Sequence, residues 1–372
     1  MADEIAATIE GVAGSWDWSS GVSFNTALVF IKPHAINEKV KEMVSNALKA
    51  REVQILYEQS LGAEEIEKGE IIDNHYSIIA QNAMNVDPRN LKVADDKLAE
   101  FETTFETSWA AALQSGTVMN ASQSMSTLAQ NGKGLAAVEE EALIKFKLGP
   151  GCYVSKCCYA MRENDVGDVV GVPVEEGEDD ASQLYIINGF YGLMREKFIA
   201  KDASVYVYVV GFTSDKLNWA TFRNDVIGPT DPAKASETSI RGKIYKEWER
   251  LGLKQVPSVG DNGVHASAGP LEGLKERMVW LQLALEQDPM GAKLIEVIWN
   301  YNTTGFITKL MDNEAVQFCS EEQPIFDLTE GMDSLEVLCI ANNLAYATPE
   351  EINDFYGEDK AEEDENGDEK DE

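Results

Sequence analysis

Apolar and polar positions alternate along the first part of the chain in a strand, helix, strand and helix order. Residues 26–32 form a short apolar run with β-branched members, which is typical of a buried strand. Residues 36–48 then place apolar side chains on one face of a helix, and Asn37 is a suitable N-terminal cap. Residues 53–57 alternate as a second strand, and a charged helical stretch runs from there toward Tyr76.

The middle of the chain has a less regular pattern. Residues 101–113 and 136–148 have helical spacing, and a pair of strands is expected to begin at Cys152. Regular order returns with a strand at 184–188 and a helix at 192–198. The pattern therefore predicts a long, less regular segment between two regular parts of the chain.

The last part of the chain begins with a clear alternating strand at 205–212. A polar stretch with glycine and proline, 228–242, predicts a long loop. Residues 270–281 predict a helix that starts with proline and has one apolar stripe, formed by Leu271, Leu274, Met278 and Leu281. Thr348 marks a later helix start, and residues 358–372 are too acidic to bury a core, which predicts a disordered tail.

Composition narrows the class of protein. The 372 residues allow two or three domains, and 44% hydrophobic residues are typical of a globular chain. The formal charge of −34 argues against nucleic acids and anionic membranes as partners. A nucleotide substrate remains compatible with this charge, because a few fixed basic side chains can dominate one pocket.

Location and redox state follow from two further features. The start of the chain is acidic, unlike a signal peptide, and no apolar run is long enough for a membrane span, so we expect a soluble, cytoplasmic protein. The five cysteines suit reduced thiols. Cys152, Cys157 and Cys158 could suggest a metal clip, but no second ligand pair follows them, so buried thiols are expected and no metal-ligating residue is assigned.

His265 is the residue with the most informative position. It lies between a turn-forming DNG sequence and a predicted helix, where free backbone N–H groups and the helix dipole favour an anion. Glu276 lies on that helix, off its apolar stripe, and a carboxylate that accepts one imidazole N–H leaves the other ring nitrogen nucleophilic. The alternative is a surface histidine near a solvated glutamate.

Four sequence motifs occur in the order found in one enzyme family. They are FIKPHAINEKV, NHY, VIGPTDPAKASETSIRGK and DNGVHASAGPLEGLKERMVWL. In these motifs the chain resembles the nucleoside diphosphate kinases. The resemblance is specific because separated polar positions agree with the family in type and order.

The resemblance implies a role for each matched residue. His265 corresponds to the family's catalytic histidine, and Ser267 and Glu276 correspond to the residues that orient it. The implied nucleotide-binding residues are Lys32, Tyr76, Thr230, Arg241 and Asn262, with Phe190 or Tyr191 as the candidate for stacking on the base. Lysine and arginine suit phosphate oxygens, and phosphoryl transfer requires mainly positioning and neutralisation of charge.

The chain departs from the family pattern beside the nucleophile and on one helix. The family's glycine after the histidine is Ala266, and the acidic residue after the serine is Ala268. The family's arginine before the signature loop aligns with Asn224, and Arg223 stands next to it.

The resemblance implies an α/β (α+β) fold, a ferredoxin-like sandwich with a four-stranded antiparallel sheet, interrupted by a large insertion. The implied kinase-like domain comprises 23–83 and 184–285. Around it lie an N-terminal extension (1–22), the insertion (84–183), a C-terminal helical extension (286–357) and the acidic tail (358–372).

The leading functional hypothesis is a nucleoside diphosphate kinase that passes the γ-phosphate of ATP, or another nucleoside triphosphate, to a nucleoside diphosphate through a phosphohistidine at His265. The resemblance implies Mg²⁺ bound with the nucleotide, and a homo-oligomer or incorporation in a larger assembly. The alternative hypothesis is a weak or silent nucleotide-binding module with a structural role in an assembly such as a cilium or flagellum.

Overall fold

Two compact units make up the protein in this computed structural model, which describes residues 2–13, 17–127, 145–149, 151–163, 169–175, 177–298, 303–319, 321–348, 351–352 and 356. Unit 1 comprises residues 1–62 and 204–372, and unit 2 comprises residues 63–203. Residues 63–83 and 184–203, which the resemblance assigned to the kinase-like domain, thus belong to unit 2. The functional domain boundaries stay a prediction.

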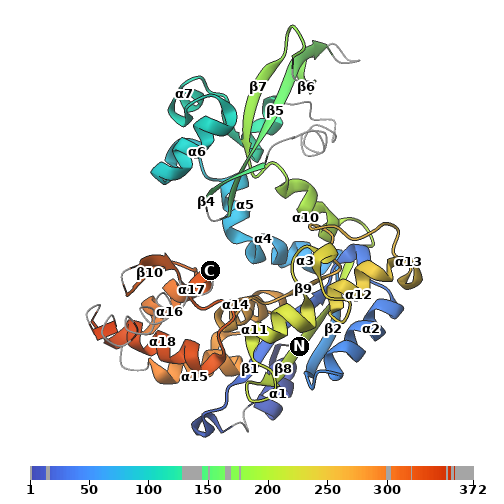
Figure 1. Ribbon diagram of the computed structural model, residues 1–372, viewed down its shortest axis with the longest axis vertical. Helices are drawn as coiled ribbons and strands as arrows, with labels where there is room; N and C mark the ends of the chain where they lie inside the picture. Colours follow the sequence, from blue (N-terminus) through green and yellow to red (C-terminus); the bar gives the residue numbers. More distant parts are fainter. Residues whose placement is uncertain are drawn as a thin grey trace, which may run out of the picture. The chain divides into compact units, whose positions relative to one another are not determined.

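Unit 1 is built on a four-stranded antiparallel sheet (Figure 1). Its strands are β1 (Phe24–Ile31), β2 (Gln54–Gly62), β8 (Ser204–Thr213) and β9 (Val264–Ala266). The spatial order is β2-β8-β1-β9, and β1 pairs antiparallel with both β8 and β9. Together with the helices between its strands, this order is that of a ferredoxin-like sandwich, so the predicted fold class is confirmed.

Strand β1 lies at the centre of unit 1 because all eight of its residues are buried. Ala27, Val29 and Ile31 face a core shared with α2 (Glu38–Lys49), whose predicted cap is confirmed by a hydrogen bond from Val40 N–H to Asn37. Phe30 lies on the opposite side of the strand and packs on a helix after β9. A strand covered on both faces reads as the continuous apolar run that the sequence showed.

Short helices connect β8 to β9. They are α11 (Trp219–Thr221), a π-helix (Phe222–Ile227), a 3₁₀ turn (Pro232–Lys234), α12 (Ile240–Lys246) and α13 (Trp248–Leu251). The polar stretch predicted as a loop therefore contains one 3₁₀ turn and the start of α12. π-helices are rare and frequently occur at functional sites.

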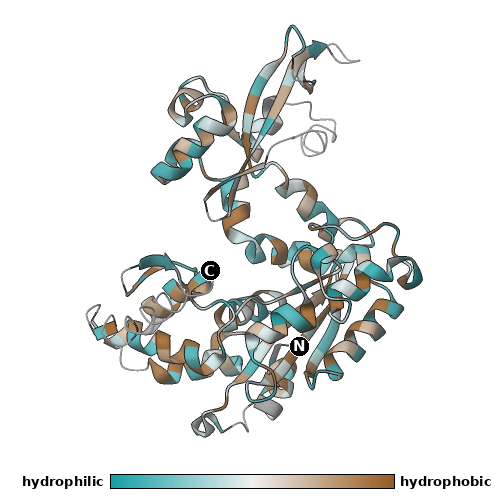
Figure 2. Cartoon of the chain, in the orientation of Figure 1, coloured by the Kyte–Doolittle hydropathy of each residue, from teal (hydrophilic) through white to brown (hydrophobic). Residues whose placement is uncertain are grey.

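Helix α14 (Pro270–Leu281) follows β9 and has the bounds that the sequence predicted, with Pro270 in its first turn. Its apolar residues Leu271 and Leu274 join a second core with the C-terminal elements. Those elements are α15 (Pro289–Val297), α16 (Thr303–Met311), β10 (Ala315–Phe318), β11 (Glu321–Pro324), α17 (Ile325–Leu328) and α18 (Ser334–Tyr346). Figure 2 shows hydrophobic and hydrophilic residues mixed along α15 and α18, as expected for helices that bury one face.

Two further elements lie near the ends of unit 1, an N-terminal helix and a helix cap at Thr348. Helix α1 (Ala2–Ala13) packs against β2, and a 3₁₀ turn (Trp18–Ser20) precedes β1. At Thr348 the predicted helix start is confirmed, because the Thr348 hydroxyl accepts a hydrogen bond from Glu351 N–H and the Glu351 carboxylate accepts one from Thr348 N–H. The predicted acidic tail lies outside the described residues.

Unit 2 has its own sheet, formed by β3 (Val118–Asn120), β4 (Lys145–Gly149), β5 (Cys152–Glu163), β6 (Val169–Pro173) and β7 (Ser182–Ile187). The helices are α3 (Ala63–Lys68), α4 (Ile71–His75), α5 (Ser77–Met84), α6 (Asp95–Phe105), α7 (Trp109–Gln114), α8 (Ala121–Thr127) and α10 (Tyr191–Ile199). The strand pair predicted to begin at Cys152 is β5 with β6. The helix predicted at 192–198 is α10.

One prediction in this unit is wrong. Residues 136–148 were expected to be helical, but Lys145–Gly149 is strand β4, and the rest of that segment lies outside the described residues. Phe146 and Leu148 alternate with the exposed Lys147 and pack into the core of unit 2. Pairing with β5 overrides the helical spacing, because both patterns fit so short an apolar segment.

Two general features concern cysteines and membranes. The five cysteines, which all lie in the described part of the chain, form no disulfide bond, and burial raises the pKa of the Cys152 thiol to about 11. Among the described residues, the helices are too short or too polar to cross a lipid bilayer.

Candidate active site

His265 lies at the middle of β9, the short edge strand of the unit 1 sheet. It is paired with Phe30 of β1, and its side chain is 16% exposed. The Phe30 ring stacks on the imidazole with 4.8 Å between centroids and 23° between planes, and Phe30 also contacts Trp280 of α14. The imidazole is thus held between the sheet and α14 with a small part of its surface open.

Glu276 of α14 is hydrogen-bonded to this imidazole. The distance from His265 Nε2 to Glu276 Oε1 is 2.5 Å, and the glutamate side chain is 4% exposed. A buried carboxylate accepts the Nε2–H proton, which leaves the lone pair on Nδ1. The arrangement therefore gives the ring one oriented, nucleophilic nitrogen.

Ser267 holds the other oxygen of Glu276. Its hydroxyl donates to Glu276 Oε2 at 2.5 Å and accepts a hydrogen bond from Leu28 N–H at 2.9 Å. The serine is fully buried. Since both carboxylate oxygens are occupied, the orientation of Glu276 is fixed from two sides.

A second carboxyl group, that of Glu272, lies one helical turn before Glu276. Burial and the neighbouring charge of Glu276 raise the pKa of Glu272 to about 8, although its carboxylate accepts a hydrogen bond from Ala268 N–H at 3.1 Å. Sequence analysis did not select this residue. The spacing of four residues on one predicted helix was the signal that could have identified it.

The loop before β9 is clamped by the segment after β1. Lys32 N–H donates to the Gly263 carbonyl at 2.9 Å, and Lys32 Nζ donates to the Gly260 carbonyl at 3.0 Å. His34 Nε2 accepts a hydrogen bond from Gly263 N–H at 3.2 Å. The predicted phosphate-contacting lysine therefore contacts the loop that contains Asn262.

Asn262 is buried, with 2% of its surface exposed. Its side-chain N–H donates to the Thr230 carbonyl at 3.0 Å, while its Oδ1 atom has no hydrogen-bond partner among the described residues. A buried acceptor without a partner is uncommon in folded proteins, and a ligand donor is one way to satisfy it. Thr230 is exposed and lies in the loop before α12.

Arg241, in the first turn of α12, contacts the backbone of the residue that precedes His265. Its guanidinium donates to the Val264 carbonyl at 3.1 and 3.3 Å and to the Gly228 carbonyl at 2.8 Å. These bonds hold a positive charge next to β9. Arg223, the neighbour of the exposed Asn224, forms an ion pair with Glu330.

The other predicted nucleotide-binding residues belong to unit 2. Tyr76 lies between α4 and α5, and the centroid of its ring is 4.4 Å from that of His75. Phe190 precedes α10, and the centroid of its ring is 5.8 Å from that of Tyr153. Tyr191 is buried and donates a hydrogen bond to Asp73. Unit 1 by itself brings together the other seven predicted site residues: Lys32, Thr230, Arg241, Asn262, His265, Ser267 and Glu276.

Comparisons with known proteins found similarity among solved structures only. No protein-family model and no curated protein matches the chain. Nucleoside diphosphate kinase from Encephalitozoon cuniculi is 14% identical with a TM-score of 0.31, and the match covers 69% of this chain and 88% of that chain. For the NDP kinase from Pyrobaculum aerophilum, the values are 14%, 0.28, 69% and 95%. With TM-scores below 0.5, these similarities carry no argument about the activity of this chain.

Proposed function

We propose that the protein is a nucleoside diphosphate kinase and that it transfers phosphate through a phosphohistidine at His265. The observation that carries the proposal is the hydrogen-bonded series from Ser267 to Glu276 to His265, with distances of 2.5 Å at both steps. An imidazole held in this way has a fixed tautomer, because Glu276 accepts the Nε2–H proton. Its Nδ1 atom is then available for attack on phosphorus.

Fixed donors around β9 support a polyanionic substrate. Arg241 and Lys32 supply positive charge in a chain of net charge −34. The open acceptor of the buried Asn262 side chain suits a ribose hydroxyl of the nucleotide. Stabilisation of phosphate charge by groups that are already oriented is the main requirement of phosphoryl transfer. Backbone hydrogen bonds hold Arg241 against Val264, the residue before His265, and hold Lys32 against Gly260 in the loop before β9.

The proposed reaction has two half-reactions. His265 Nδ1 forms a bond to the γ-phosphorus of a nucleoside triphosphate, the bond from that phosphorus to the bridging oxygen breaks, and the diphosphate leaves with the electron pair. A terminal phosphate oxygen of a second nucleoside diphosphate then attacks the phosphorus of the phosphohistidine. The bond from Nδ1 to phosphorus breaks, and its electron pair returns to Nδ1 of the ring. Mg²⁺ is part of the substrate as the metal–nucleotide complex and neutralises phosphate charge.

The test is phosphorylation of the full chain with γ-labelled ATP. We expect a label that acid removes and base does not, located on the peptide that contains His265, and its release as triphosphate when GDP is added. ATP labelled at the α-phosphate is the control for bound nucleotide. The variant His265→Asn should remain folded and take up no label.

Two results would decide against the proposal. Folded wild-type protein without acid-labile label would favour the alternative of a silent nucleotide-binding module, and nucleotide binding could then be measured directly by calorimetry. Equal labelling of the wild type and the His265→Asn variant would place the phosphate elsewhere.

A further inference from the structure

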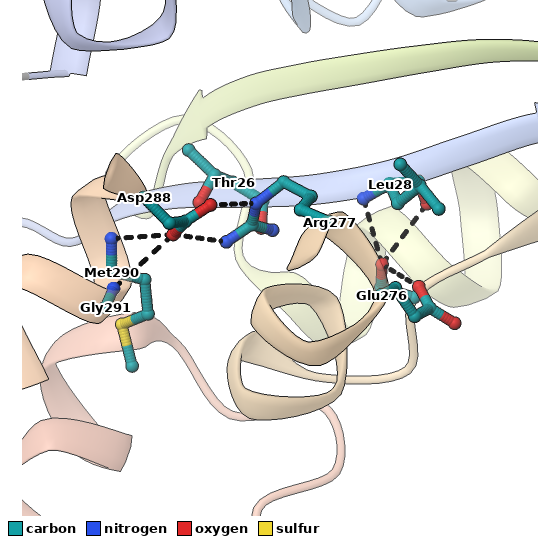
Figure 3. Close-up of polar contacts among 8 residues, drawn as sticks. Thr26, Leu28, Glu276, Arg277, Asp288, Met290 and Gly291 are labelled. Atoms are coloured by element: carbon teal, nitrogen blue, oxygen red, sulfur yellow. Dashed lines mark hydrogen bonds and ion pairs between the residues drawn. The ribbon is translucent and has the colours of Figure 1, made fainter. Parts of the chain in front are cut away.

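Arg277 is a fully buried cation that follows Glu276 directly on α14 (Figure 3). Its Nε atom is 2.6 Å from Asp288 Oδ2, and its Nη2 atom is 2.9 Å from Asp288 Oδ1. Its remaining nitrogen, Nη1, donates to the carbonyl of Thr26 on β1. Because both charged side chains are 0% exposed, this bidentate pair has one well-defined geometry.

The contact with Thr26 lies on the edge of β1 that faces β9, at a position beyond the end of β9. β9 pairs only with residues 29–31 of β1, so the backbone of Thr26 and Leu28 extends beyond the end of β9. Ser267 satisfies both backbone groups of Leu28, with Ser267 N–H donating to its carbonyl at 3.0 Å. Ser267 and Arg277 thus anchor the segment that carries Glu276 to two successive outward-facing positions of the same strand edge.

Gly273 lies between these two anchors. A Cβ atom at this position would be 3.0 Å from Arg277 Nη1 and 3.2 Å from Ser267 Oγ. A side chain at this position would crowd both polar groups, so the glycine leaves room for them. The polar contacts of α14 with β1 therefore form one closely packed group.

We propose that Arg277 is a positioning residue that fixes the rotation of α14 and thereby holds Glu276 against His265. Side-chain ends lie roughly 5–6 Å from a helix axis, so a rotation of about 20° would move the Glu276 carboxylate by ~2 Å. A hydrogen bond of 2.5 Å does not survive such a shift.

Asp288 connects this function to the segment after α14. Asp288 Oδ1 also accepts hydrogen bonds from Met290 N–H at 3.0 Å and Gly291 N–H at 3.4 Å, which begin helix α15. The predicted C-terminal extension therefore contributes a residue that supports the site.

The test compares Arg277→Lys, Gly273→Ala and the double variant Arg277→Met/Asp288→Asn in the full chain. The double variant leaves no unpaired buried charge, and Gly273→Ala introduces a helix-favouring residue, so folding is kept in at least these backgrounds. Lys275→Met is the matched control, because it removes a positive charge from the other side of Glu276 on the same helix.

The first readout is ¹⁵N NMR of the imidazole rings, which is tractable because the chain has three histidines and His265→Gln assigns the signal. We expect the Nε2-protonated tautomer of His265 to dominate in the wild type and in Lys275→Met, and to lose about half or more of its population in the three test variants. The second readout is the labelling rate, which should fall by about 10- to 100-fold with little change in the ATP concentration that half-saturates it.

The labelling rate rests on the proposed function, whereas the tautomer does not. If the wild type takes up no phosphate but its tautomer responds to Arg277, the kinase proposal fails and the positioning role stands. Folded test variants with the wild-type tautomer signal would overturn the positioning role.

Discussion

Glu272 offers a direct measure of the electrostatics around the candidate nucleophile. Its carboxyl group lies beside that of Glu276, and burial together with that neighbouring charge raises its pKa from 4.5 to about 8. The nearby Arg223 acts in the opposite direction, and Glu330 adds to the rise. At neutral pH Glu272 is thus expected to be protonated in the folded state and ionised in the unfolded state.

The sign of the pH dependence follows from proton binding. Between pH 4.5 and about 8 the folded protein retains a proton that the unfolded chain loses, so the free energy of unfolding decreases as the pH rises. At about 1.4 kcal/mol per pH unit, this interval corresponds to at most ~5 kcal/mol. Below pH 4.5 the carboxyl group is protonated in both states, so it no longer makes the free energy of unfolding depend on pH.

The substitution Glu272→Gln should remove this dependence while its amide oxygen still accepts the hydrogen bond from Ala268 N–H. Denaturant unfolding at pH 5 and pH 8.5 is the measurement, followed by tryptophan fluorescence, because all tryptophans except Trp109 belong to unit 1. The variant should gain stability over the wild type by about 2–5 kcal/mol more at the higher pH. Glu249→Gln, at an exposed position of α13, should show no such gain.

A stability difference between Glu272→Gln and the wild type that is constant across this pH interval would refute the reasoning. It would mean that Glu272 is ionised in the folded state and that its distance from Glu276 is larger than the structure indicates.

Two further predictions concern the backbone around β9. Gly263→Ala should destabilise the protein by about 2 kcal/mol or more in denaturant unfolding, because Gly263 has a φ of +89° and a Cβ atom would lie 2.6 Å from the Ile244 side chain. Gly252→Ala, with a φ of +82° and open space around it, should cost only about 1 kcal/mol. Arg241→Lys should leave the carbonyl of Gly228 or of residue 264 without its donor. This loss should lower the free energy of unfolding by about 1–3 kcal/mol and raise the KM for ATP. The control Arg250→Lys, at an exposed position, should change neither quantity.

The parts of the fold that the sequence predicted best are those whose local pattern and tertiary environment agree. Residues 27–31 of β1 are all apolar because the strand is covered on both faces, and α14 begins at Pro270 and ends at Leu281 as its apolar stripe indicated. Lys145–Gly149 shows the opposite case. Its apolar spacing fits a helix or a strand, and only pairing with β5 decides between them.

The candidate site divides in a similar way. The resemblance to the kinase motifs selected His265, Ser267 and Glu276 as candidates, because their types and separations are visible in one stretch of chain. Arg277 was not identified, since a lysine or arginine on a helix is normally solvated and nothing in the local sequence shows that it is buried. Its partners Thr26 and Asp288 come from either side of it in the chain.

By itself, the sequence determined strands β1, β2 and β8 and helices α2 and α14 of unit 1, and the residue types available for phosphate chemistry. Those properties depend on short-range periodicity and on side-chain chemistry. Only the tertiary structure decided which groups meet, because β9 ends after three residues and leaves the edge of β1 to Ser267 and Arg277. A hydrogen bond to a strand edge depends on where a neighbouring strand stops, and local sequence does not encode that position.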